Sequence, residues 1–292
     1  MHDLLCGKLL GDGCLTKQQG RKPRLQFIHC KKDMGWSAHC YEQLAPFLPL
    51  NPPTYRQVID TRITIGYTES YMVQSRTSKE ICRLYEIWYP HSQKELPYAY
   101  IEEHFTDKSL AWWYQDDGHF KQQDGVPRKV ILSTDNFSLM ENQFLIDFLQ
   151  KKYGLSFSLD GQNRILLYDQ FQIIYFLKLV EPYIHKSMNR KKRVQSEPQK
   201  IADRTTIYLP SDIILVKPTA EINEQYKKLS LLSSLAEDYK VFFKQNILAS
   251  KLTLNSKSYQ IKINKDCKDI LGQLKYQTGL NISQLTTCCF RL

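Results

Sequence analysis

Residues 5–13 read LCGKLLGDG, and residues 110–118 read LAWWYQDDG. Each run ends with an aspartate directly before a glycine, Asp12 in the first and Asp117 in the second. The apolar residues before each pair predict short helices over 3–12 and 108–117, because a glycine just past the last turn is a usual helix end. The chain is therefore expected to contain two similar helices, about 105 residues apart, that each carry a carboxylate at the C-terminal end.

The segments that begin with these helices follow one order: helix, hairpin, helix, hairpin, helix. After the first helix, alternating and amphipathic patterns predict the remaining elements at 14–30, 33–45, 54–68 and 78–89. After the second helix they are predicted at 119–134, 138–152, 155–159 with 164–168, and 169–181. Two copies of one order indicate an internal duplication, with two similar halves related by a pseudo-twofold axis.

The chain beyond the second copy has a different character. Residues 194–223 contain three prolines and little periodicity, which predicts a linker with a short extended piece. Residues 224–250 predict one long helix, and an alternating strand at 259–264 precedes two helical segments separated by Gly279. The expected domains are 1–97, 98–193 and 224–292, with 194–223 as the linker.

The composition restricts the kind of partner. The 292 residues carry a formal net charge of +10 and 42% hydrophobic residues, so we expect about two folded domains and a polyanionic partner, either nucleic acid or an anionic membrane. No stretch approaches the ~20 apolar residues of a membrane-spanning helix, and no signal peptide is expected. The eight cysteines include no Cys-x-x-Cys pair, which argues against structural zinc and for a reducing, intracellular compartment.

The two aspartates stand where a helix tolerates them poorly. A helix C-terminus carries about half a negative charge, so a carboxylate there is disfavoured by up to ~1 kcal/mol unless a cation neutralises it. Two such ends near a pseudo-twofold axis would form a paired divalent-metal site, which suits hydrolysis of a phosphodiester because the metal lowers the pKa of a water and stabilises the leaving oxygen. The alternative is that Asp12 and Asp117 are solvated loop acids after ordinary helices.

The two nonapeptides resemble the paired motifs of LAGLIDADG homing endonucleases, and about residues 3–192 are similar to the two-motif, monomeric members of that family. The resemblance implies an α+β fold of two αββαββα halves that form a β-saddle over DNA around the paired motif helices, with a small C-terminal α/β appendage. Small side chains that would let these helices approach closely are Cys6, Gly7, Gly11 and Ala111. Departures from the family pattern stand at Leu10, Trp112 and Gln115.

The same resemblance assigns the reacting groups. Asp12 and Asp117 match the catalytic, metal-binding acids, one for each DNA strand, and the expected metal site also includes Gly11 and Asp116. Lys94 and Lys191 match a basic residue in each active site, where an ammonium near the scissile phosphate would offset charge that develops in the transition state. The expected cofactors are two or three Mg²⁺ ions, for which Mn²⁺ substitutes.

The residues that would read DNA follow from the saddle, because a strand presents alternate side chains to one face. Arg and Gln suit base edges in the major groove, whereas Lys mostly meets phosphates. The expected contact residues are Arg21, Lys22, Arg24, Gln26, Arg56, Arg62, Thr64, Lys121, Gln123, Arg128, Lys129, Arg164, Lys186, Arg190 and Lys192. The alternative is a solvated basic face without a nucleic-acid partner.

The C-terminal segment resembles a ribbon-helix-helix module, in which a two-stranded ribbon reads the major groove. The resemblance implies that Gln260 and Lys262 face the bases. Such a ribbon needs a second strand, either from another copy of the chain or from an internal partner. A plain accessory domain is the alternative.

For the whole chain we predict a site-specific, Mg²⁺-dependent endonuclease that cuts both strands of a long, asymmetric DNA site and leaves short 3′ overhangs, as the family resemblance implies. An intron RNA maturase or a catalytically silent DNA-binding protein on the same fold are the alternatives. We expect a monomer, with a dimer through the tail as the alternative, and no contact with a membrane. The expected location is the cytoplasm or nucleoid of a prokaryote, or an organelle matrix.

Overall fold

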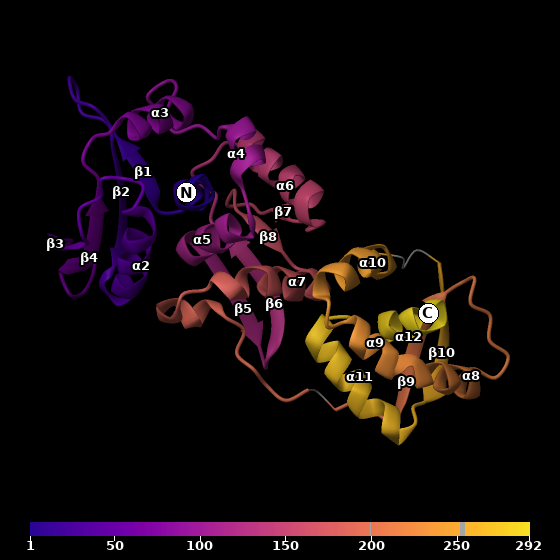
Figure 1. Ribbon diagram of the computed structural model, residues 1–292. Helices are drawn as coiled ribbons and strands as arrows, with labels where there is room; N and C mark the ends of the chain where they lie inside the picture. The colour runs from indigo at the N-terminus through magenta and orange to yellow at the C-terminus, as the bar shows by residue number, and fades with distance from the viewer. Residues whose placement is uncertain (199, 252–254) are drawn as a thin grey trace.

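The computed structural model describes residues 1–198, 200–251 and 255–292, and for 247–251 the backbone only. Two four-stranded antiparallel sheets lie on either side of a central pair of helices, and a third unit lies at the C-terminal end (Figure 1). The first half consists of α1 (His2–Leu10), β1 (Gly13–Thr16), β2 (Arg24–Cys30), α2 (Met34–Leu44), β3 (Thr54–Ile59), β4 (Tyr67–Gln74) and α3 (Lys79–Trp88). After α4 (Tyr98–His104), the second half consists of α5 (Asp107–Asp117), β5 (Gly118–Gln123), β6 (Val126–Leu132), α6 (Leu139–Tyr153), β7 (Ser158–Leu159), β8 (Ile165–Leu167) and α7 (Gln170–Val180).

The two halves share one order of elements and one order of strands. The sheets run β1-β2-β4-β3 and β5-β6-β8-β7, so the α+β class and the predicted αββαββα order are confirmed. Gly13 opens β1 opposite Phe27, and Gly118 opens β5 opposite Leu132. Each Asp-Gly pair therefore stands where a central helix ends and a sheet begins.

The centre of the molecule is the contact between α1 and α5. A Cβ atom added to Gly7 would lie 2.4 Å from the Ser109 carbonyl oxygen, so no larger residue fits at this crossing without a shift. The Ser109 hydroxyl donates to the Asp3 carbonyl oxygen over 2.6 Å and ties the N-terminal ends of the two helices together. Cys6 and Ala111 are fully buried in the same contact, as the sequence predicted.

Helix starts and stops follow local chemistry. Ser138 and Glu141 form a reciprocal capping box at the start of α6, and Gly154 ends that helix with a left-handed backbone, φ 74°. Thr106 and Ser109 form the same arrangement at the start of α5. These caps fix the ends of the helices that carry or cover the site.

The C-terminal unit consists of β9 (Arg204–Pro210), α8 (Pro218–Gln225), α9 (Leu229–Leu235), α10 (Tyr239–Lys251), β10 (Ser256–Lys262), α11 (Lys265–Thr278) and α12 (Ile282–Arg291). The strand partner of β10 is β9 of the same chain, so the ribbon is completed without a second copy. The unit packs on α7, where the rings of Tyr175 and Phe243 stack at 3.8 Å, and it also contacts the chain beyond α7, where Arg193 lies 3.8 Å from the ring centre of Tyr276.

Several predicted boundaries are wrong. The alternating residues 62–65 are not a strand. The Asp60 N–H donates to the carbonyl oxygen of Gly66, the Asp60 carboxylate accepts from the Arg62 N–H, and Gly66 has φ 79°, so 60–66 form the turn between β3 and β4. The single helix predicted over 224–250 is broken into α8, α9 and α10, and α4 was not predicted. The expected linker 194–223 contains β9 and most of α8, which belong to the C-terminal unit.

Over the described residues, no helix is long and apolar enough to cross a bilayer. The eight cysteines are all free thiols.

The α1–α5 contact predicts the effect of one methyl group. We expect Gly7→Ala to lower the free energy of unfolding by about 1–3 kcal/mol, because the added Cβ meets backbone that cannot move aside. The matched control is Gly161→Ala, where nothing lies within 4 Å of the added atom. Urea unfolding of both variants measures the difference, and equal stability would show that the helices are not in close contact.

Candidate active site at the paired helix ends

The two acids lie at the C-terminal ends of α1 and α5. Asp117 is the last residue of α5, whereas Asp12 follows the end of α1 by two residues and is therefore outside the helix. The Asp12 side chain is 35% exposed, and Asp117 is half-buried. Among the described residues, no hydrogen bond or ion pair holds the carboxylate of Asp117.

A lysine lies next to each acid at a matching place. The Lys94 ammonium donates to the carbonyl oxygen of Gly13, 3.3 Å away, and Lys191 donates to the carbonyl oxygen of Gly118. Gly13 and Gly118 are the residues directly after the two acids. The structure thus brings Lys94, from the loop before α4, and Lys191, from the 3₁₀ helix η3 (Lys186–Lys191), to equivalent positions.

The charges at this site are strongly coupled. Burial, and then the charge of Asp116, raise the pKa of Asp12 to about 7 and that of Asp117 to about 7. Burial lowers the pKa of Lys94 and of Lys191, although the three acids act in the opposite direction. Without metal, ionising Asp12 and Asp117 therefore costs more free energy than ionising an aspartate in water, and a bound cation would favour their charged forms.

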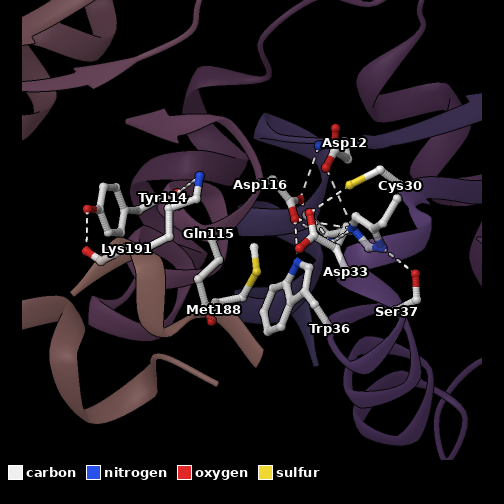
Figure 2. Close-up of polar contacts among 12 residues, drawn as sticks. Asp12, Cys30, Asp33, Trp36, Ser37, Tyr114, Gln115, Asp116, Met188 and Lys191 are labelled. Carbon is white, nitrogen blue, oxygen red and sulfur yellow. Dashed lines mark hydrogen bonds and ion pairs between the residues drawn. The ribbon is translucent and has the colours of Figure 1, made fainter. Parts of the chain in front are cut away.

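Asp116 differs from its neighbour Asp117 in that several donors converge on its carboxylate, as Figure 2 shows for Asp116. Its side chain is fully buried, and its Oδ1 and Oδ2 accept from the Lys8 ammonium at 2.8 and 2.9 Å. Trp36 Nε1 donates to Oδ1 over 2.7 Å, and His29 Nε2 lies 3.4 Å from Oδ1. Burial alone would raise the pKa of Asp116, but Lys8 and His29 hold it well below its usual range.

The donor set suits a hard divalent cation, because such ions take carboxylate oxygens. Asp12 and Asp117 offer oxygens with few or no partners, whereas both oxygens of Asp116 are already matched by donors. One ligand atom each of Asp12, His29 and Asp116 lie within 4.8 Å of one another. The Lys8 ammonium lies within 3.2 Å of His29 Nε2 and of Asp116, so a cation is already present in that group. We therefore regard Asp12 and Asp117 as the groups best placed to hold metal, with Gly11 beside them.

The expected DNA-contact residues fall into two classes. Arg24, Gln26 and Arg56 share the strand face that does not pack on helices, since Gln26 is opposite Gln74 of β4, Arg56 is opposite Ser70 of β4, and Arg24 is two residues before Gln26. In the second sheet, Lys121 and Lys129 are paired on the same kind of face. The further exposed or half-exposed residues are Arg21, Lys22, Gln123, Arg128, Lys186 and Lys192.

Eight of the expected contact residues lie outside the strands: Arg21, Lys22, Arg62, Thr64, Arg164, Lys186, Arg190 and Lys192. Arg62 and Arg164 lie in turns and form ion pairs with Asp60 and Asp160, respectively. Thr64 lies in the same turn as Arg62. Arg190 forms an ion pair with Asp33 over 2.7 Å, which fastens η3 to the first half of the chain. The prediction that Arg62 and Thr64 alternate along a strand is therefore wrong.

The ribbon residues are exposed, as predicted from their alternation. Gln260 pairs with Thr206 and Lys262 with Arg204, so these four side chains share one face of the β9–β10 ribbon. Ile261 and Ile263 are buried on the other face.

Sequence reasoning missed the residues around Asp116. Lys8, His29 and Trp36 are all buried and converge on its carboxylate. The available signal was Lys8, because it is the one charge within residues 4–11 and would be costly to bury without a partner. His119, exposed on β5 opposite Ile131, was also missed, and burial and nearby cations lower its pKa.

Comparison with known proteins places the chain in a family. Residues 2–178 match the family model of the LAGLIDADG DNA endonuclease family. An uncharacterised protein of Methanocaldococcus jannaschii is 29% identical over 207 residues, which cover 66% of this chain and 73% of that protein. The cytochrome b mRNA maturase bI2 of Debaryomyces hansenii is 27% identical over 200 residues, covering 65% and 72%. The solved structure of the homing endonuclease I-WcaI bound to its DNA recognition sequence shares the fold with a TM-score of 0.56, at 24% identity over 65% of this chain and 84% of that one.

The raised pKa values predict how metal binding depends on pH. Protons and metal compete for the oxygens of Asp12 and Asp117, so affinity for Ca²⁺ should be full about one pH unit above 7, be reduced at about pH 7, and be at least ~10-fold lower by about pH 6. Calorimetric titration at several pH values measures this. In Asp117→Asn both the affinity and its dependence on pH should decrease, and an affinity that ignores pH in the parent protein would contradict the assignment.

Proposed function

The chain belongs to the LAGLIDADG DNA endonuclease family, and from that membership we propose that it is a site-specific homing endonuclease that cuts both strands of a double-stranded DNA target. The observation that carries the proposal is the pair of acids, Asp12 and Asp117, at the ends of two helices in contact. Beside each acid, a lysine donates to the carbonyl oxygen of the glycine that follows the acid. One acid and one lysine for each strand is the arrangement that two coordinated cuts require.

The acids are proposed to hold the divalent ions, Mg²⁺ in the cell with Mn²⁺ as a substitute. The open carboxylate of Asp117 and the exposed one of Asp12 support this role. Bound ions of this kind lower the pKa of the attacking water and stabilise the leaving oxygen. Gly11 and Asp116 are proposed to shape the site rather than to offer an oxygen to the metal, because both oxygens of Asp116 already accept hydrogen bonds.

The lysines are proposed to act on the phosphate. Burial and the carbonyl contacts of Lys94 and Lys191 hold each ammonium in one place beside an acid. A fixed ammonium stabilises charge that develops on the phosphate in the transition state, because it needs no reorganisation during the reaction. The same two groups weaken the repulsion among Asp12, Asp116 and Asp117.

The two sheets are proposed to form the DNA surface. The basic and amide side chains on their uncovered faces, such as Arg24, Gln26, Arg56, Lys121 and Lys129, suit contacts with phosphates and base edges. Because the residues on the two sheets differ, the preferred site is asymmetric. We propose that the cuts lie across the minor groove and leave short 3′ overhangs.

The C-terminal ribbon is proposed to extend this contact. The face that carries Arg204, Thr206, Gln260 and Lys262 is exposed, polar and basic, which suits a phosphate backbone or a groove. The unit rests on α7 through stacked aromatic rings, so the ribbon keeps a constant position relative to the second sheet. The protein is proposed to act as a monomer inside the cell.

A role in RNA maturation is the second candidate, because one relative is a cytochrome b mRNA maturase. The same basic surface accepts RNA, and cleavage separates the two functions. A protein that binds intron RNA tightly and leaves DNA uncut under all conditions would be a maturase.

The central prediction concerns the two acids. With Mg²⁺ and a library of DNA sites, the parent protein should produce double-strand cuts at one sequence, and Asp12→Asn or Asp117→Asn should reduce double-strand cutting by ~100-fold or more, because each change removes a charged metal ligand. Binding measured with Ca²⁺ by gel shift should change little. Asp147→Asn, on the exposed surface of α6, is the matched control. Undiminished cutting by either variant would remove that acid from the mechanism.

A separate prediction concerns the ribbon. Lys262→Ala should weaken binding of a long duplex and reduce the slope of log affinity against log salt by about 1, as expected for one lost phosphate contact. A duplex trimmed to the central site should be bound equally by parent and variant. Lys244→Ala, an exposed position on α10, is the control. Equal salt slopes on the long duplex would show that the ribbon does not meet DNA.

A further inference from the structure

The two acids of the site are held by different means. Asp117 is the final residue of α5 and keeps its place through the helix. Helix α1 ends at Leu10, so Asp12 lies outside the helical hydrogen-bond ladder. Its backbone N–H donates instead to Oδ2 of Asp116, 3.1 Å away. A residue of the second half therefore orients an acid of the first.

The Asp116 carboxylate has the properties of a rigid anchor. Both oxygens accept hydrogen bonds from the Lys8 ammonium, and Oδ1 accepts a further one from Trp36 Nε1. The Asp116 and Lys8 side chains are both fully buried. A buried ion pair adds little net stability to a fold, but separating its partners leaves unpaired charges away from water. Because that separation is costly, the Asp116 carboxylate stays in the orientation that faces Lys8.

The two motifs are not equivalent at these positions. In the second nonapeptide, Trp113 stands where the first has Lys8, and Asp116 stands where the first has Gly11. A Cβ atom added to Gly11 would lie 2.6 Å from Asp116 Cβ and 2.6 Å from its Oδ2. The interface therefore has room for one carboxylate at this level, and Gly11 provides the space that Asp116 occupies.

We propose that Lys8 and Asp116 are a positioning pair for one of the two cuts: Asp116 holds the backbone of Asp12 in its working orientation, and Lys8 holds Asp116. The inference rests on the proposed nuclease function and adds an asymmetry to it. Loss of the pair should slow cleavage of the DNA strand that is cut at Asp12 more than cleavage of the strand that is cut at Asp117. Neither residue touches the phosphate.

The test uses a duplex of the preferred site with a different fluorophore on each strand. In the double variant Lys8→Met/Asp116→Ala, which removes the pair without leaving an unpaired charge, one strand should be cut ~10–100-fold more slowly relative to the other, the usual effect of losing a group that orients a metal ligand. Nicked duplex should accumulate. The matched control is Ser109→Ala, which loosens the other end of the α1–α5 contact by removing the hydrogen bond to Asp3.

A measurement without cleavage, on the unaltered full chain, is the second arm. Amide hydrogen exchange by NMR should show the Asp12 N–H protected although it is outside a helix, with protection lost in the double variant while the Asp117 amide keeps its own. Equal slowing of both strands in the double variant, as in Ser109→Ala, or an unprotected Asp12 amide in the parent, would overturn the inference. If the parent cuts no DNA, the proposed function fails, and the exchange data alone decide whether Asp116 holds Asp12.

Discussion

The contact of α1 with α5 is the constraint on which the rest of the structure depends. Gly7 meets the backbone of Ser109 directly, so the two helix axes come as close as main chains allow. The C-terminal ends of the two helices are also close, because the Asp12 N–H donates to Asp116, and the first strand of each sheet begins directly after Asp12 or Asp117. The sheets diverge from that point to either side. One pair of helices thus places the two proposed reacting centres between the two sheets.

Two helix C-termini close together concentrate negative charge, and the three aspartates there are compensated in two different ways. Asp116 is neutralised internally by Lys8 and is a part of the fold. Asp12 and Asp117 are only partly compensated, by lysines that donate to neighbouring carbonyls rather than to the carboxylates themselves. The raised pKa values of these two acids express that incomplete compensation. Two aspartates that are adjacent in the chain thus differ: Asp116 is a structural residue, and Asp117 is the one proposed to take part in the chemistry.

Much of this could be predicted from the sequence, for physical reasons that differ by element. The helix end at Asp117, the end of α1 to within two residues of Asp12, and the order of helices and strands along the chain follow from glycine stops and alternating patterns, which are local. The turn at 60–66 was misread because Arg62 to Ile65 alternate like a strand, whereas the ion pair with Asp60 and the left-handed Gly66 decide otherwise. The environment of Asp116 could not be predicted from the sequence, since Lys8, His29 and Trp36 come together only through tertiary packing. The completion of the ribbon by β9 was foreseen only as one of two possibilities.

The space shared by Gly11 and Asp116 bears on how such a chain descends from a duplication. Two copies of the second half, joined as a symmetric dimer, would bring two carboxylates into a volume that accepts one. Two copies of the first half would bury two lysines with no acid between them. Neither half is therefore complementary to a second copy of itself at this level. With a glycine and a lysine on one side and an acid on the other, each half supplies what the other lacks.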